Sequence, residues 1–86
     1  MRVFLHRDFL KAYKKLSPHD QENWKARKRI FLENPFHPLL SNHALHGEYE
    51  GYRSINITGD IRAIYEPHDT NVALFIIIGS HSELYS

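Results

Sequence analysis

With 86 residues, 42% of them apolar, the chain is expected to form a single domain, residues 1–86, around one small core. It has no cysteine, which excludes disulfides, a thiolate nucleophile and cysteine-bound metal clusters and suits a reducing cytoplasm. The net charge is +1, and the chain shows neither a run of roughly 20 apolar residues nor a signal-peptide core, so we expect a cytoplasmic protein without a membrane partner.

The first part of the chain predicts a strand followed by two helices. Residues 2–5 can form a strand, and residues 8–16 can form a helix whose apolar side chains recur at spacings of three and four. A second helix is expected to begin at Ser17-Pro18, because serine is a good N-cap and proline fits the first helical position. It should end at about residue 33, since Asn34 precedes a proline. The two helices together predict an antiparallel hairpin.

The second part predicts a loop and then strands. Residues 35–47 hold two prolines and three histidines without periodicity, which indicates an irregular loop. Residues 52–57 and 61–65 alternate in polarity, so each predicts a strand, with a turn at residues 58–60 between them.

A final apolar strand is expected at residues 72–78, buried on both faces, after a connection at residues 66–71. Gly79 should end it by adopting backbone angles that other residues avoid, leaving His81 and Tyr85 at an exposed rim. The element order predicts an α+β domain: a small antiparallel sheet with an N-terminal strand and the helical hairpin packed on one face. The other face of the sheet should stay partly free.

Charge is distributed unevenly along the chain. Residues 1–34 hold nine Lys/Arg against four Asp/Glu, a net +5, whereas residues 35–86 hold two against six, a net −4. The basic half could attract an anionic partner such as RNA or an acidic peptide, through forces that weaken with salt. The alternative is that these basic residues form an ordinary solvent-exposed helix face and bind no partner.

Four polar side chains from separate segments can meet on the free face of the sheet: His43, Asp60, Arg62 and His81. Each also has a purely structural interpretation, because aspartate is common in turns and exposed strands and termini often carry arginine or histidine. The pair His43 and His46 lies three apart in a segment without helical pattern, so no metal site is predicted. Neither a glycine-rich phosphate loop nor a Gly-x-Ser-x-Gly elbow is present. Phosphodiester cleavage without a metal or cofactor fits these residues best.

Four motifs in the second half resemble one known family. They are Asn42-His43-Ala44-Leu45-His46-Gly47, Gly51-Tyr52-Arg53, Gly59-Asp60-Ile61-Arg62-Ala63-Ile64-Tyr65 and Gly79-Ser80-His81-Ser82-Glu83-Leu84-Tyr85. Together they resemble the RelE/ParE superfamily of bacterial toxins, in particular its YafQ-like branch. The resemblance covers most of residues 42–86, whereas the helical half is similar in length and layout.

The resemblance implies a RelE-like fold and a ribosome-dependent, metal-independent mRNA endonuclease, the toxin of a type II toxin-antitoxin pair. In such enzymes the RNA 2′-hydroxyl attacks the adjacent phosphate, so the protein supplies a proton acceptor, a proton donor and charge for the transition state. The implied catalytic residues are His81 as general acid, His43 as the preferred general base, and Asp60, which orients a histidine or shares the base role. The implied partners are a cognate antitoxin and mRNA on the 70S ribosome.

Four further residues are expected to contact RNA. Arg62 can stabilise phosphate charge, and Tyr85 can stack on a base. Asn56 stands where YafQ-like members can carry another histidine, and it can form hydrogen bonds but cannot exchange protons near neutral pH. His46 is the candidate to replace that histidine.

Two alternatives stay open at this point. ParE-like members of the superfamily share the scaffold but inhibit DNA gyrase by binding and have no nuclease residues; the histidines of this chain argue against that function. The other alternative is a catalytically inactive module that keeps only its antitoxin-binding surface.

Overall fold

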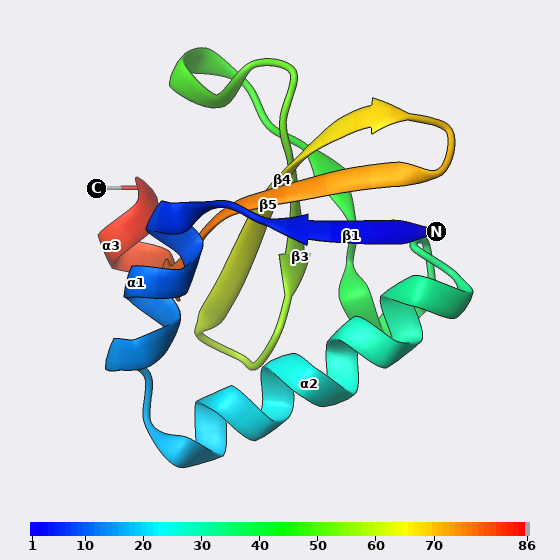
Figure 1. Ribbon diagram of the computed structural model, residues 1–86. Coiled ribbons are helices and arrows are strands. Elements are labelled where there is room, and N and C mark those ends of the chain that lie inside the picture. Colours follow the sequence, from blue (N-terminus) through cyan, green and yellow to red (C-terminus); the bar gives the residue numbers. More distant parts are fainter. Residues whose placement is uncertain (86) are drawn as a thin grey trace.

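A mixed sheet of five strands organises residues 1–85, which are the residues that the computed structural model describes. Its strands lie in the order β1-β5-β4-β3-β2 (Figure 1). The elements, in chain order, are β1 (Arg2–Leu5), α1 (Arg7–Lys15), α2 (Pro18–Glu33), η1 (Pro38–Leu40), β2 (His43–Ala44), η2 (Gly47–Tyr49), β3 (Arg53–Asn56), β4 (Ile61–Asp69), β5 (Val72–Ser80) and α3 (His81–Tyr85).

The predicted α+β class and strand-helix-helix-strand-strand-strand order are confirmed. β3, β4 and β5 form the expected antiparallel meander, in which Asn56 pairs with Arg62 and Arg62 pairs with Gly79. β1 lies parallel to β5, with Arg2 beside Val72, so the sheet is mixed rather than antiparallel throughout. The loop predicted at residues 35–47 also contains η1 and the short edge strand β2.

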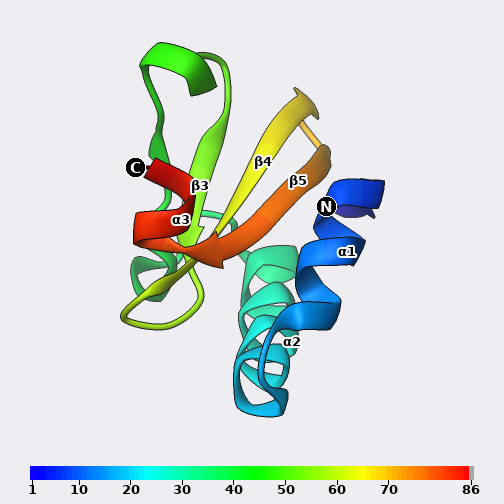
Figure 2. The same ribbon diagram turned by 90° about the vertical axis from the view of Figure 1, so that its left-hand side faces the viewer.

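α1 and α2 cover one face of the sheet, as predicted, and α3 lies on the other side (Figure 2). The expected limits of α2 are confirmed, because the Ser17 hydroxyl accepts a hydrogen bond from the Asp20 amide at 3.1 Å and Asn34 follows the last turn. α1 begins one residue earlier than expected, since the His6 ring caps it by accepting from the Asp8 amide at 2.9 Å. In the described part of the chain, no helix is long and apolar enough to cross a membrane.

An aromatic cluster joins the two helices to the sheet. Phe75 of β5 is fully buried, and its ring centroid lies 6.1, 5.0, 5.2 and 5.0 Å from those of Phe9, Trp24, Phe31 and Tyr65. All four ring pairs are tilted or edge-on, the geometries that aromatic quadrupoles favour. One strand residue thus contacts α1, the middle and the C-terminal end of α2, and the neighbouring strand.

The expectation that β5 is buried on both faces is wrong. Ala73, Phe75 and Ile78 are buried against the helices, whereas Leu74 and Ile77 are only partly buried. A bulge shifts the register between β4 and β5, so Phe75 and Ile78 face the same side although they are three residues apart. A simple alternation of polar and apolar residues is therefore not expected along this strand.

The connection expected at residues 66–71 is also wrong. β4 extends to Asp69, and a two-residue turn joins it to β5. Pro67 suggested an interruption, but the pairing of β3 with β4 goes no further than Tyr65. Beyond that residue β4 has no β3 neighbour, so a proline removes no hydrogen bond on that side.

Gly79 does not end β5, which continues through Ser80, and its backbone is outside the left-handed region. A Cβ atom at residue 79 would lie 3.2 Å from Glu83 Oε1 and 3.5 Å from Leu84 Cδ2. Glycine therefore leaves room for the close approach of the α3 side chains, and it does not adopt the unusual φ angle that the sequence suggested.

We expect Phe75→Ala to lower the free energy of unfolding by about 3–5 kcal/mol, because it removes a buried ring and leaves a cavity among four aromatic neighbours. The measurement is urea unfolding followed by tryptophan fluorescence and circular dichroism. Phe4→Ala is the control: Phe4 is 47% exposed on β1, and its loss should cost less than about 1 kcal/mol. Equal effects of the two substitutions would contradict the central place of Phe75.

Candidate functional site

A hollow of about 430 Å³ is lined by Asn56 and Arg62, which alternate along their strands with the core residues Ile55 and Ala63. It therefore lies on the face of the sheet opposite α1 and α2. Five of the seven predicted site residues line it, together with Ser41 and Leu45: His43, Asn56, Arg62, His81 and Tyr85. These side chains come from β2, β3, β4 and α3, so segments far apart in the sequence meet here. We call this space the histidine hollow.

Asn56 and Arg62 form the floor of the histidine hollow, where they are paired across β3 and β4. Arg62 Nη1 donates to the carbonyl oxygens of Thr58 and Ile61, at 2.9 and 3.3 Å. Because these bonds use Nη1, the guanidinium is fixed by the turn and can still present Nη2 to an anion.

His43 stands at the rim, exposed on the edge strand β2. Its Nδ1 lies 2.9 Å from the carbonyl oxygen of Ser41, whose left-handed backbone (φ 45°) follows η1. A carbonyl oxygen can only accept, so Nδ1 carries the proton and Nε2 of the neutral ring holds a lone pair. This imidazole is therefore oriented as a proton acceptor.

His81 is exposed, as expected, and it is the first residue of α3, a short helix that was not predicted. Its amide donates to the carbonyl oxygen of Asp60 at 2.9 Å, which ties the helix to the turn between β3 and β4. Its ring centroid lies 4.7 Å from that of Tyr85, one helical turn further on. The contact limits the directions in which the histidine ring can point.

A reciprocal capping box starts α3. The Ser80 hydroxyl accepts from the Glu83 amide at 3.2 Å, and Glu83 Oε1 accepts from the Ser80 amide at 2.8 Å. These bonds to Ser80 hold the pKa of Glu83 below its usual range, so its carboxylate stays ionised at neutral pH. The pattern Ser-x-x-Glu is readable in the sequence and could have revealed this helix.

Tyr85 is anchored from the far end of α3. Its hydroxyl donates to Ser54 Oγ at 2.9 Å, and Ser54 is fully buried on β3. Ser54 lies on the same strand face as Asn56, two residues away, and the sequence analysis missed it. The alternating pattern of residues 52–57 indicated that Ser54 shares a face with Asn56. It did not indicate the partner of Ser54, Tyr85, which is 31 residues away in the chain.

The structure leaves two predicted residues outside the histidine hollow. Asp60 lies on the exposed turn, where its amide donates to Thr58 Oγ1 and its carbonyl receives the His81 amide. His46 is 84% exposed, and its Nδ1 lies 3.8 Å from Glu50 Oε1. Together with Tyr85 it lines a second, smaller hollow of about 240 Å³. Among residues 1–85, no three His, Asp or Glu side chains gather as a metal site.

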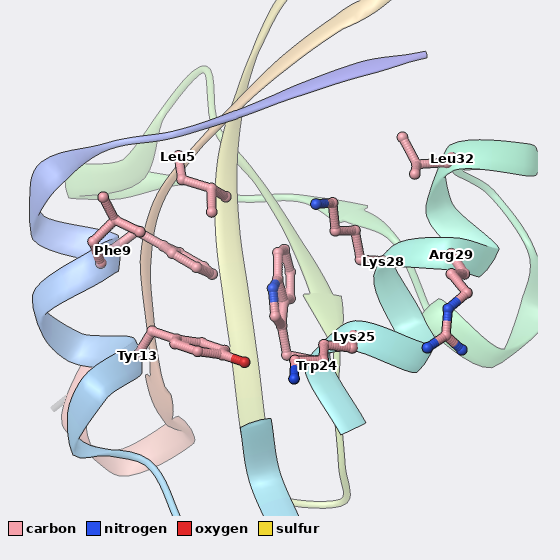
Figure 3. A pocket seen from close by; sticks show the side chains of 9 residues that line it. Leu5, Phe9, Tyr13, Trp24, Lys25, Lys28, Arg29 and Leu32 are labelled. Carbon is pink, nitrogen blue, oxygen red and sulfur yellow. The ribbon is translucent and has the colours of Figure 1, made fainter. Parts of the chain in front are cut away.

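A second depression, which we call the helix groove, lies between α1 and α2 and has a volume of about 440 Å³ (Figure 3). The helices stay close where Gln21 Nε2 donates to the Tyr13 carbonyl at 3.0 Å, near their connection. Further along they diverge, so the predicted hairpin is open (Figure 1). The groove has apolar walls and a basic rim; its lining residues are Leu5, Phe9, Leu10, Tyr13, Trp24, Lys25, Lys28, Arg29 and Leu32.

The mixed sheet, the helices on one face and the histidine hollow on the other define the class of small α+β toxins that the sequence motifs resemble. A family model described as "Bacterial toxin of type II toxin-antitoxin system, YafQ" matches residues 1–86. The chain therefore belongs to the YafQ family of type II toxin-antitoxin toxins.

Solved structures agree with this fold. YafQ from E. coli strain BL21(DE3) superposes with a TM-score of 0.83 at 21% identity, with 100% of each chain covered. A chain of the E. coli DinJ-YafQ toxin-antitoxin complex gives 0.79 at 20% identity, covering 98% of this chain and 96% of that one. A YoeB/ParE toxin from Agrobacterium tumefaciens gives 0.76 at 21% identity, covering 94% and 99%. No curated protein matches the sequence significantly.

The hydrogen bond between Tyr85 and Ser54 predicts measurable coupling. Tyr85→Phe should lower the free energy of unfolding by about 1 kcal/mol, because it leaves the buried Ser54 hydroxyl without its partner. In a double-mutant cycle with Ser54→Ala, urea unfolding should give a coupling energy of roughly 0.5–1.5 kcal/mol. Additive effects of the two substitutions would show that the bond contributes nothing to stability.

Proposed function

We propose that the histidine hollow is the active site of an endoribonuclease that cleaves mRNA during translation on the 70S ribosome. The observation that supports this most directly is the meeting of His43, His81 and Arg62 around one space. A proton acceptor, a proton donor and a fixed cation are the groups that cleavage by an internal nucleophile needs.

In the proposed reaction the RNA supplies its own nucleophile. The 2′-hydroxyl attacks the adjacent phosphorus, a bond to the 5′-oxygen of the next nucleotide breaks, and a cyclic phosphate remains. One proton leaves the 2′-hydroxyl and one reaches the departing oxygen. The mechanism therefore calls for no metal-bound hydroxide and no cofactor.

His43 is assigned as the general base, because its Nδ1 is engaged by the Ser41 carbonyl and its Nε2 is left as the acceptor. His81 is assigned as the general acid to the 5′-oxygen. An imidazole ring can accept a proton when it is neutral and donate one when it is protonated, which suits it to either role. Two histidines on separate elements, β2 and α3, can then act on opposite sides of a phosphate.

The other predicted residues take binding roles in this proposal. Arg62 balances charge on the phosphorane-like transition state, and Asn56 beside it donates a hydrogen bond to a phosphate or base. Tyr85 offers its ring to a base, with His46 next to it on the outer side. Asp60 contributes through its carbonyl, which holds the His81 amide; a catalytic role for its carboxylate requires it to turn inward from the exposed loop.

We expect His81→Ala and His43→Ala each to slow cleavage by roughly 10²- to 10⁴-fold, the usual value of a general acid or base. The measurement is primer extension on a reporter mRNA translated in a bacterial extract, with and without a translation inhibitor. His68→Ala is the matched control, because His68 pairs with Glu66 on β4 and does not line the histidine hollow.

Cuts that persist when translation is blocked would contradict ribosome dependence. Growth arrest without any cuts, unaffected by His81→Ala, would replace the nuclease with a gyrase-binding toxin. Folded protein that causes neither cuts nor arrest would be an inactive antitoxin-binding module.

We further propose that the helix groove holds a segment of the cognate antitoxin that is amphipathic and acidic. Phe9 and Tyr13 from α1 and Trp24 from α2 extend into the groove, and Lys28 and Arg29 lie along α2 beside it (Figure 3). An apolar floor favours burial of apolar side chains, and a rim of one charge favours the opposite charge in the partner. The groove is on the helical face, so its occupant can bind without filling the histidine hollow.

Lys28→Glu should weaken antitoxin binding at least about 10-fold at low salt, and by less at high salt, because ions screen the interaction. Isothermal titration calorimetry of the purified pair at two salt concentrations measures this. Lys14→Glu makes the same charge change on α1 outside the groove and should have little effect. Equal losses in both variants would indicate general charge attraction and no specific role for the groove.

A further inference from the structure

α3 is too short to be stable by itself. It has five residues, whereas isolated helices shorter than about 12–15 residues are marginal in water. Its C-terminal end is held by the bond between Tyr85 and Ser54, and its N-terminal end by the capping box of Ser80 and Glu83. The direction of the His81 side chain therefore depends on contacts outside the histidine hollow.

Glu83 is the residue whose side chain closes the capping box. Its carboxylate lies in a different depression, between α3 and α1, which is also lined by Asp8, Lys11 and Lys15. It is absent from the lining of the histidine hollow. Glu83 therefore does not line the space around the reacting groups, and it can act on them by fixing the backbone of α3.

Two neighbours show that this arrangement is tightly fitted. The carboxylate reaches the Ser80 amide across residue 79, where a Cβ atom would stand 3.2 Å from Glu83 Oε1. Such a contact is tighter than ordinary van der Waals packing, so glycine leaves the room that the carboxylate uses. The bonds to Ser80 lower the pKa of the same carboxylate, and the charge of Lys15 lowers it to a smaller extent.

We propose that Glu83 is a positioning residue for His81. Its bond to the Ser80 amide sets where α3 begins, and His81 is the first residue after Ser80. The hydrogen bond from the His81 amide to the Asp60 carbonyl then ties the start of α3 to the connection between β3 and β4. The inference rests on the proposed nuclease function, because only there does the aim of the His81 ring affect a reaction.

The test compares Glu83→Ala with Glu83→Gln in the full chain. Glutamine can also complete a capping box, so it keeps the acceptor while removing the charge. Glu83→Ala should lower kcat for mRNA cleavage roughly 10- to 100-fold, as expected for a misplaced catalytic group, with KM unchanged. Glu83→Gln should stay within about threefold of the parent protein. The control is Glu33→Ala, at the exposed end of α2.

Three results would overturn the proposal. One is unchanged cleavage by Glu83→Ala. Another is an equal loss in the alanine and glutamine variants, because the charge and not the acceptor would then matter. The third is a rise in KM at constant kcat, which would make Glu83 a binding residue.

A second measurement separates this inference from the nuclease proposal. Hydrogen exchange by NMR reports protection of the His81 amide, which bonds to Asp60. Exchange should be at least about 10-fold faster in Glu83→Ala, with Glu83→Gln and Glu33→Ala like the parent. If the parent chain cleaves no RNA, the nuclease proposal fails, and these rates alone decide whether Glu83 holds His81. Equal rates in all variants would overturn the positioning role.

Discussion

The packing of Phe75 against aromatic side chains from α1, α2 and β4 holds both long helices on one face of the sheet. β5, the strand that carries Phe75, lies between β1 and β4, so it also joins the parallel and antiparallel parts of the sheet. Because this cluster occupies one face, polar residues can gather on the other. The histidine hollow is thus possible because the apolar core is confined to one side.

The same strand links stability to the proposed chemistry. β5 continues without a loop into α3, so the end of a core strand delivers His81 directly to the histidine hollow. Stable packing fixes where α3 begins, and short-range bonds at Ser80, Glu83 and Ser54 fix how it is oriented. Substitutions in the core should therefore act mainly on stability, and substitutions around α3 mainly on the site.

Local patterns predicted some elements better than others. The limits of α2 followed from Ser17-Pro18 and Asn34, because capping and proline sterics act within a few residues. The extent of β4 was missed, since the tolerance of Pro67 depends on which strand lies beside it. α3 was missed although Ser80 and Glu83 form a capping box, because a five-residue helix has no periodicity to recognise. Asp60 was placed with the histidines because its turn was expected at the same side of the sheet, yet Asp60 lies on the exposed turn and does not line the histidine hollow.

The sequence by itself determined the α+β class, the order of the main elements, the motifs of the YafQ family and most residues of the histidine hollow, because these depend on residue type and short spacing. Only the tertiary structure decided that Tyr85 bonds Ser54, that Ser41 orients His43, and that Gly79 makes room for Glu83. The contact between Tyr85 and Ser54 joins residues 31 apart in the chain, so it depends on the pairing of β3, β4 and β5. The other two contacts are short-range, but they depend on the left-handed backbone of Ser41 after η1 and on the path by which β5 runs into α3, and residue type alone does not show either of these.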